Sequence, residues 1–282
     1  MNYAAIRFLF CLLFVAIEGF AYDNQEHSSA TFWHDGTFHQ DKIDCSKIKE
    51  GTIRAEVDGK WQDYKIRDLP ESFQKWSFER RLETLERFRN QQPPELSGPH
   101  NGMVATYGVA RNDSRFNVNN AVKGMGWLPR QDKLEEMINL LESTAGDDFN
   151  SKLNRLDSLY NQGSEIFDPG CQVSLELYST PEFETATFLN QMTNPACAVV
   201  FLDMPSYEFK AIAHLMHPED PQLTEIERLQ VEYANLVHSY FHGSFATQFT
   251  AVVYYVVEVY DNSPGKPEAK GRRIVPELPL MP

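Results

Sequence analysis

Long hydrophobic runs are absent from this 282-residue sequence beyond its first twenty residues. The run at the start, Phe8–Ile17, holds about ten residues, half of the roughly twenty that a membrane-spanning helix needs. Arg7 precedes the run, and the small residues Gly19 and Ala21 follow it. This layout predicts a cleavable secretory signal over residues 1–21. We therefore expect a secreted or periplasmic protein without stable membrane insertion after cleavage.

Positive charge is scarce. The chain has 26 Lys and Arg residues against 40 Asp and Glu residues, which gives a formal net charge of -14. A protein surface with this negative net charge repels the phosphate groups of DNA and RNA, so we do not expect nucleic acid as a partner. The hydrophobic fraction of 42% and the aromatic fraction of 12% are those of a folded protein. The sequence therefore predicts an acidic, soluble, globular body.

Cysteine is also rare. Cys11 belongs to the predicted signal, which leaves Cys45, Cys171 and Cys197 in the exported chain. Two of three thiols are expected to pair in an oxidising compartment. Cys171 and Cys197 each open a strand-like run, and they would meet if those strands were parallel neighbours. We expect a Cys171–Cys197 disulfide, while pairings through Cys45 stay open.

The common catalytic motifs are missing as well. The sequence contains no GxSxG elbow, no glycine-rich phosphate loop, no HExxH and no CxxC. A serine hydrolase, a kinase or a thioredoxin-like function therefore has no motif to support it.

Histidines are concentrated in the last third of the chain. His214 and His217 are three residues apart, and His238 and His242 are four apart. Residues at these separations lie on one side of a helix, so each pair can chelate an ion. The four histidines predict a site for Zn or Cu, the metals that suit imidazole. If residues 206–217 form a strand instead, the first pair points to opposite faces and fails as a chelate.

The segment that follows the predicted signal is polar, and a β pattern begins after it. Residues 22–50 lack periodicity and predict a loosely ordered N-terminal arm. Residues 52–57 and 60–66 flank Asp58-Gly59, the pattern of a hairpin with a type I′ turn. A helical stripe follows from Phe78 to Phe88. We expect this hairpin and helix to elaborate the N-terminal side of one globular domain, residues 51–265, followed by a tail at 266–282.

Two amphipathic helices are expected in the middle, at 129–143 and 149–160, where apolar residues recur at helical spacing. Strands are expected at 171–178, 197–202 and 250–260, and helices at 181–192 and 224–242. Thr224 and Glu227 form the capping box that begins the last helix. The run at 250–260 is apolar on both faces and predicts a central strand.

The segment at 206–217 decides the architecture. Phe209, Ile212 and Leu215 follow a helical spacing, with Ser206 as a possible cap, so we favour a helix there. The fold class is then α/β or α+β, a mixed sheet covered by amphipathic helices. A strand at 206–217 gives the alternative, a ferredoxin-like βαββαβ C-terminal half.

These observations lead to two functional hypotheses. The first is an exported soluble protein that binds a small ligand or a protein partner, with no catalysis of its own identified. The alternative is a metal-dependent extracytoplasmic enzyme centred on the four histidines. The histidine cluster is the only feature that favours the alternative.

Overall fold

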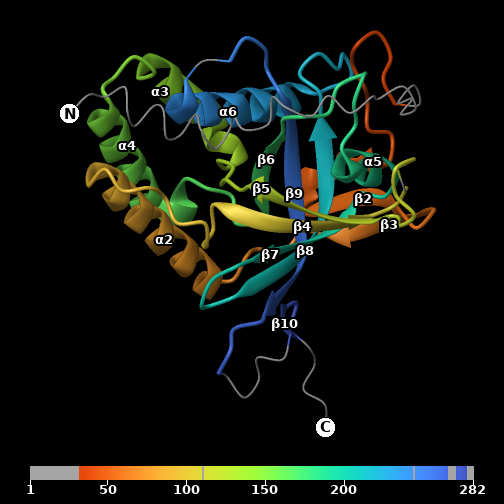
Figure 1. Ribbon diagram of the computed structural model, residues 1–282, viewed down its shortest axis with the longest axis horizontal. Helices are drawn as coiled ribbons and strands as arrows, with labels where there is room; N and C mark the ends of the chain where they lie inside the picture. Colours follow the sequence, from red (N-terminus) through yellow and green to blue (C-terminus); the bar gives the residue numbers. More distant parts are fainter. Residues whose placement is uncertain (1–31, 110, 244, 266–270, 278–282) are drawn as a thin grey trace.

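Five α-helices and ten β-strands are found in the part of the chain that the computed structural model describes, residues 32–109, 111–243, 245–265 and 271–277 (Figure 1). The predicted signal lies outside these residues. The strands are β1 (Ile43–Asp44), β2 (Thr52–Val57), β3 (Lys60–Lys65), β4 (Asn101–Tyr107), β5 (Val118–Gly124), β6 (Cys171–Glu176), β7 (Ala196–Phe201), β8 (Tyr207–Met216), β9 (Thr250–Asp261) and β10 (Arg272–Val275). The helices are α2 (Glu71–Arg89), α3 (Leu134–Ser143), α4 (Phe149–Gln162), α5 (Ala186–Thr193) and α6 (Glu225–His242).

The predicted hairpin is confirmed as β2 and β3, which join β1 in a three-stranded antiparallel sheet. Asp58 and Gly59 have φ of 51° and 72°, the left-handed pair that a type I′ turn requires. Ile53 and Ala55 of β2 are fully buried because they share the face that turns toward the main body. The hairpin is therefore anchored through one strand, and β3 stays largely exposed.

The main sheet has seven strands in the order β10-β9-β8-β7-β4-β5, and β6 also pairs with β9. All of its strand pairs are antiparallel. The fold is thus α+β, a sheet flanked by helices. The predicted central strand is confirmed, because β9 pairs with β8 along one edge and with β6 and β10 along the other.

The helix expected at 206–217 is wrong, because Tyr207–Met216 forms the strand β8. This strand pairs with β7 on one side and β9 on the other, and its last six residues are all buried. A strand buried on both faces carries apolar residues at every spacing, so it also matches a helical stripe. A register shift between Lys210 and Ala211 further breaks its two-residue alternation.

The C-terminal half has the βαββαβ element order of the alternative, but its sheet is not ferredoxin-like. In a ferredoxin-like sheet the first of the four strands lies between the third and the fourth. Here the fourth strand, β9, lies between the first, β6, and the third, β8.

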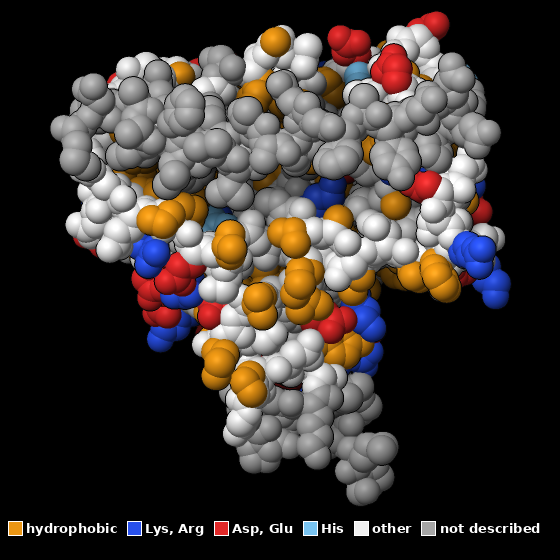
Figure 2. Space-filling view, in the orientation of Figure 1, with side chains coloured by type: hydrophobic (Ala, Val, Ile, Leu, Met, Phe, Trp, Pro, Cys, Tyr) orange, Lys and Arg blue, Asp and Glu red, His pale blue; other side chains and the backbone are white. Residues whose placement is uncertain are grey.

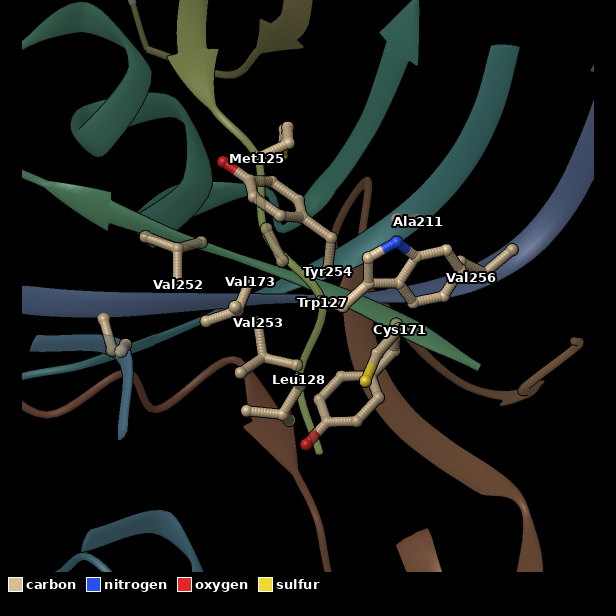
Figure 3. Close-up of a cluster of buried hydrophobic side chains, with 14 of the residues drawn as sticks. Met125, Trp127, Leu128, Cys171, Val173, Ala211, Val252, Val253, Tyr254 and Val256 are labelled. Carbon is tan, nitrogen blue, oxygen red and sulfur yellow. The ribbon is translucent and has the colours of Figure 1, made fainter. Parts of the chain in front are cut away.

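The sheet curls until its two ends approach each other. Gly126, just beyond β5, exchanges two backbone hydrogen bonds of 2.8 and 2.9 Å with Val173 of β6. Figure 1 shows β5 and β6 lying side by side as a result. A cluster of buried side chains lies across this closure, including Met125, Trp127, Val173 and Tyr254 (Figure 3).

The helices gather around the sheet in two groups (Figure 1). The first group holds α2, α3, α4 and α6, in which α3 packs on α6 and α2 packs on α4. The capping box of α6 is confirmed: Thr224 and Glu227 bond each other's backbone N–H groups. The other group is α5 alone, which packs against β4, β5 and β8.

Residues 32–50, the described part of the arm that we expected to be loosely ordered, are packed on the main body. The aromatic rings of Trp33 and Phe38 lie against Phe188 of α5. The Gln40 side chain is buried and donates to the carbonyl oxygens of Gln191 and Ala213. In the predicted tail, residues 272–275 join the sheet as β10.

Among the described residues, no helix is both long enough and apolar enough to span a membrane.

Acidic and basic side chains lie close together beside α2 (Figure 2). There, Arg80 pairs with Glu83, Glu95 and Asp203.

Candidate functional site

The four histidines predicted to share a metal ion have different surroundings. His217 follows β8, where its Nδ1 lies 3.0 Å from the hydroxyl of Thr37 and its ring meets the Trp33 ring edge-on. His238, on α6, stacks against Phe245 with ring centroids 5.2 Å apart. The side chain of His242 lies outside the described residues. In the described part of the chain, the one group of three or more metal-ligating side chains includes His214 and neither His217 nor His238.

His214 instead meets Cys45 and Glu227. Its Nδ1 lies 3.4 Å from Cys45 Sγ, and its Nε2 lies 3.8 Å from Glu227 Oε1. Neither partner was predicted from the sequence. The capping box already explained Glu227, and Cys45 was the cysteine that remained outside the predicted disulfide. The pairing of His214 with His217 assumed a helix at 206–217, whereas that segment is the strand β8, in which His214 lies beside α6 and the N-terminal segment.

This cluster is not an activated nucleophile. Burial of the Cys45 thiol, together with the negative charge of the nearby Glu227 carboxylate, raises the pKa of the thiol far above its usual value. Burial lowers the pKa of His214 to about 4. Both groups are therefore neutral at physiological pH, whereas a nucleophilic cysteine needs a thiolate.

The structure also corrects the expected disulfide. Cys171 and Cys197 are free, buried thiols on β6 and β7, and β9 and β8 lie between these strands. The predicted disulfide needed β6 and β7 to be parallel neighbours, whereas two strands separate them in the sheet and all of its strand pairs are antiparallel. The prediction failed because it rested on parallel neighbouring strands.

A cavity of about 440 Å³ lies where the curled sheet stops being closed. Strand β5 bounds the cavity on one side, and residues from both of its faces line the cavity. Tyr178, which follows β6, and the first turn of α5 line it as well. The segment after β4 closes a further side. Below the cavity, the Gly126–Val173 bonds hold β5 and β6 together. We call this cavity the β5 groove.

The backbone of β5 faces the β5 groove at alternate residues. Asn117 accepts a hydrogen bond from Gly108 N, and Met125 N donates to His100 O, so odd-numbered residues bond toward β4. Because backbone groups alternate along an antiparallel strand, Val118, Asn120 and Val122 direct their N–H and C=O groups to the other edge. Gly126 follows the same alternation where it bonds Val173. The sheet order gives β5 no second strand partner among the described residues.

The floor of the β5 groove is polar and held by hydrogen bonds. Asn119 donates to the hydroxyl of Thr187 at 2.8 Å. Asn190 accepts from the backbone N–H of Val109 at 2.9 Å and donates to Thr106 at 3.1 Å. Thr187 and Asn190 are both buried residues of α5. These bonds fix α5 against β4 and β5, so the floor is preformed.

Apolar side chains surround the mouth of the β5 groove. The exposed fractions are 72% for Phe116, 65% for Val118, 66% for Val122 and 52% for Tyr178. An exposed edge strand is usually protected by charged residues or proline. In β5 the only charged residue is Lys123, which pairs with the buried carboxylate of Glu176 at 2.6 Å. Among the residues that the structure describes, no strand pairs with this edge, so it can accept a further strand.

No protein-family model matches the chain, and a search of curated proteins returns no match.

Proposed function

We propose that this chain is an exported binding protein whose β5 groove takes an extended peptide segment of a partner protein as an added strand. The observation that carries the proposal is that the outer edge of β5 lies along a preformed cavity and has no strand partner within the described part of the chain. Peptides that add to a sheet edge gain affinity from main-chain hydrogen bonds and selectivity from alternate side chains.

The backbone of β5 explains why a peptide suits this groove. The edge-facing residues Val118, Asn120 and Val122 repeat every two positions, at about 6.8 Å along a strand. An extended peptide repeats its own donors and acceptors at the same interval. Each hydrogen bond contributes about 0.5–1.5 kcal/mol, so several are needed for useful affinity.

The side chains around the β5 groove indicate what the peptide carries. Val118 and Val122 lie two positions on either side of Asn120 and are exposed on one face of the sheet. They favour β-branched or aromatic residues at alternate peptide positions, because cross-strand pairs of this kind stabilise sheets. On the other face, Asn119 and the first turn of α5 favour small polar residues.

The test uses a fluorescein-labelled octapeptide of alternating Val and Thr, with binding to the mature chain measured by fluorescence anisotropy. The matched control is the same peptide N-methylated at the residues that would donate to β5. We expect saturable binding of the unmodified peptide and a loss of at least tenfold on N-methylation, equivalent to about 1.4 kcal/mol. Equal binding of both peptides, or no binding of either, would overturn the proposal.

A pair of variants tests the same edge from the protein side. Val122→Pro removes an N–H that points away from β4, so the β4–β5 ladder keeps its bonds. Val122→Ala removes the same side chain but keeps the N–H. We expect Val122→Pro to bind the octapeptide about tenfold more weakly than Val122→Ala, with similar thermal unfolding of the two. Equal affinities would show that the peptide does not pair with β5.

A further inference from the structure

Three side chains from distant parts of the sequence converge beside α6. Cys45 follows β1, His214 lies in β8 and Glu227 lies in the first turn of α6. One ligand atom from each of them lies within 4.8 Å of the other two. Thiolate, imidazole and carboxylate are the three kinds of ligand that zinc takes in proteins.

Each of the three side chains is held in place by its own element. His214 is buried, and its backbone pairs with Val253 of β9. Glu227 uses Oε2 for the N–H and hydroxyl of Thr224, both at 2.7 Å, which turns Oε1 toward His214. The carbonyl of Cys45 accepts a hydrogen bond from Ile48 N in the turn after β1. The cluster is thus preformed by a strand, a capping box and a turn.

The distances fit a tetrahedral ion with small adjustments. Bond lengths of about 2.0–2.3 Å place zinc ligand atoms about 3.3–3.7 Å apart. An imidazole binds one ion through one nitrogen, so the 3.4 Å contact of Nδ1 with Cys45 Sγ and the 3.8 Å contact of Nε2 with Glu227 Oε1 belong to alternative ligand sets. With one ligand atom from each residue, the three atoms lie within 4.8 Å of one another, so movements of about 1 Å bring them to zinc spacing.

The charges also fit a divalent cation. On binding Zn²⁺ the Cys45 thiol would release its proton to solvent, and the resulting thiolate and the Glu227 carboxylate would balance two positive charges. This suits a site whose imidazole is buried and whose other two residues are partly exposed. Outside the three ligands lies a second pair: His39 Nδ1 is 2.7 Å from the buried carboxylate of Asp220.

From this geometry we infer that Cys45, His214 and Glu227 bind one Zn²⁺ ion, with a fourth position open to water or another ligand. Binding would tie the N-terminal segment to β8 and α6. The site replaces the four-histidine cluster that the sequence suggested, and it is independent of the β5 groove, whose lining residues are different.

The test titrates Zn²⁺ into the metal-free mature chain with its thiols reduced, followed by calorimetry. Co²⁺ is used in parallel, because a thiolate ligand gives a sulfur-to-cobalt charge-transfer band. We expect one equivalent of Zn²⁺ and a charge-transfer band with Co²⁺. Stoichiometry below a few tenths of an equivalent, or a cobalt spectrum without that band, would overturn the inference.

Matched variants identify the ligands. Cys45→Ser removes the thiolate. Glu227→Gln removes the carboxylate yet keeps a side chain that serves in a capping box, so α6 still begins normally. The controls are Glu225→Gln, in the same turn of α6, and His238→Gln.

We expect each ligand variant to weaken Zn²⁺ binding by more than the roughly 10–100-fold that losing a supporting residue costs. Both controls should bind as the unchanged chain does. Circular dichroism before titration shows whether each variant is folded. Folded Cys45→Ser and Glu227→Gln variants with unchanged affinity would refute the assignment. If one variant fails to fold, the other decides.

Discussion

The side chain of Gln40 pairs with Leu215 as a strand residue would. Leu215 N donates to Gln40 Oε1 at 2.7 Å, while Gln40 Nε2 donates to the carbonyl of Ala213 at 3.2 Å. Strand β7 begins at Ala196, opposite Ile212, and Pro195 O just before it accepts from Ala213 N, so β7 provides no partner for Leu215. A single carboxamide thus extends the ladder and fastens the N-terminal segment to the sheet.

Replacing Gln40 should therefore be costly. Gln40→Ala leaves the buried N–H of Leu215 and two carbonyl groups without their partner, and we expect a loss of about 2–4 kcal/mol in the free energy of unfolding. Urea denaturation measures the loss. Gln62→Ala, at an exposed position of β3, serves as the control and should change stability by less than about 0.5 kcal/mol. A similar effect for both variants would mean that the Gln40 contacts add nothing.

Gly102 of β4 should tolerate no side chain. A Cβ there would lie 2.7 Å from Cγ1 of Val199 and 2.9 Å from Cγ of Met125. We expect Gly102→Ala to destabilise the fold by about 1–3 kcal/mol through overpacking. Gly124, on the neighbouring strand, has open space around its Cα, so Gly124→Ala should be neutral or slightly stabilising. Thermal unfolding followed by circular dichroism compares the two.

Glu184 should make stability depend on pH. Burial raises its pKa to about 7, although the indole N–H of Trp33, 2.9 Å away, opposes the shift. The folded state holds this proton more tightly than the unfolded state does, so its stabilising contribution is complete below about pH 4.5 and is lost as the pH rises through 7.

Glu184→Gln keeps an acceptor for Trp33 and removes the titration. We expect the variant to match the unchanged chain at pH 4 and to exceed it by about 2 kcal/mol at pH 8. Urea unfolding at the two pH values gives the difference. The same stability gain at both pH values would show that Glu184 does not titrate as stated.

The ion pair at the base of the β5 groove should be sensitive to the loss of one partner. Lys123→Met leaves the carboxylate of Glu176 buried without its cation, which costs about 3–5 kcal/mol. Lys123→Met combined with Glu176→Gln should recover much of that loss, because no uncompensated charge remains. A double-mutant cycle from denaturant unfolding measures the coupling. Additive effects would contradict a direct interaction.

Local signals predicted much of the fold. The Asp58-Gly59 turn, the capping box of α6 and the double-sided burial of β9 each act within a few residues, and each was confirmed. The strand β8 was mistaken for a helix because its two buried faces leave no alternation to detect. The disulfide prediction then failed for a long-range reason, the order of the strands.

The candidate sites were harder to predict than the fold. Cys45 and Glu227 are 182 positions apart in the sequence, and only the packing of β1 and α6 around β8 brings them together. His214 was predicted as a ligand, but together with His217. Residues three apart lie on one side of a helix, whereas in a strand they point to opposite faces. The β5 groove depends on the curl of the whole sheet, which no local pattern encodes.

The position of Gln40 bears on how the protein is shortened for experiments. A version that starts at residue 51, the domain limit suggested by sequence patterns, lacks the carboxamide that caps β8, the strand β1 and the thiol of Cys45. Such a fragment exposes the end of β8 and the aromatic face of α5. Weak folding or aggregation of that fragment would reflect the loss of the segment before residue 51 rather than a defect in the residues that remain.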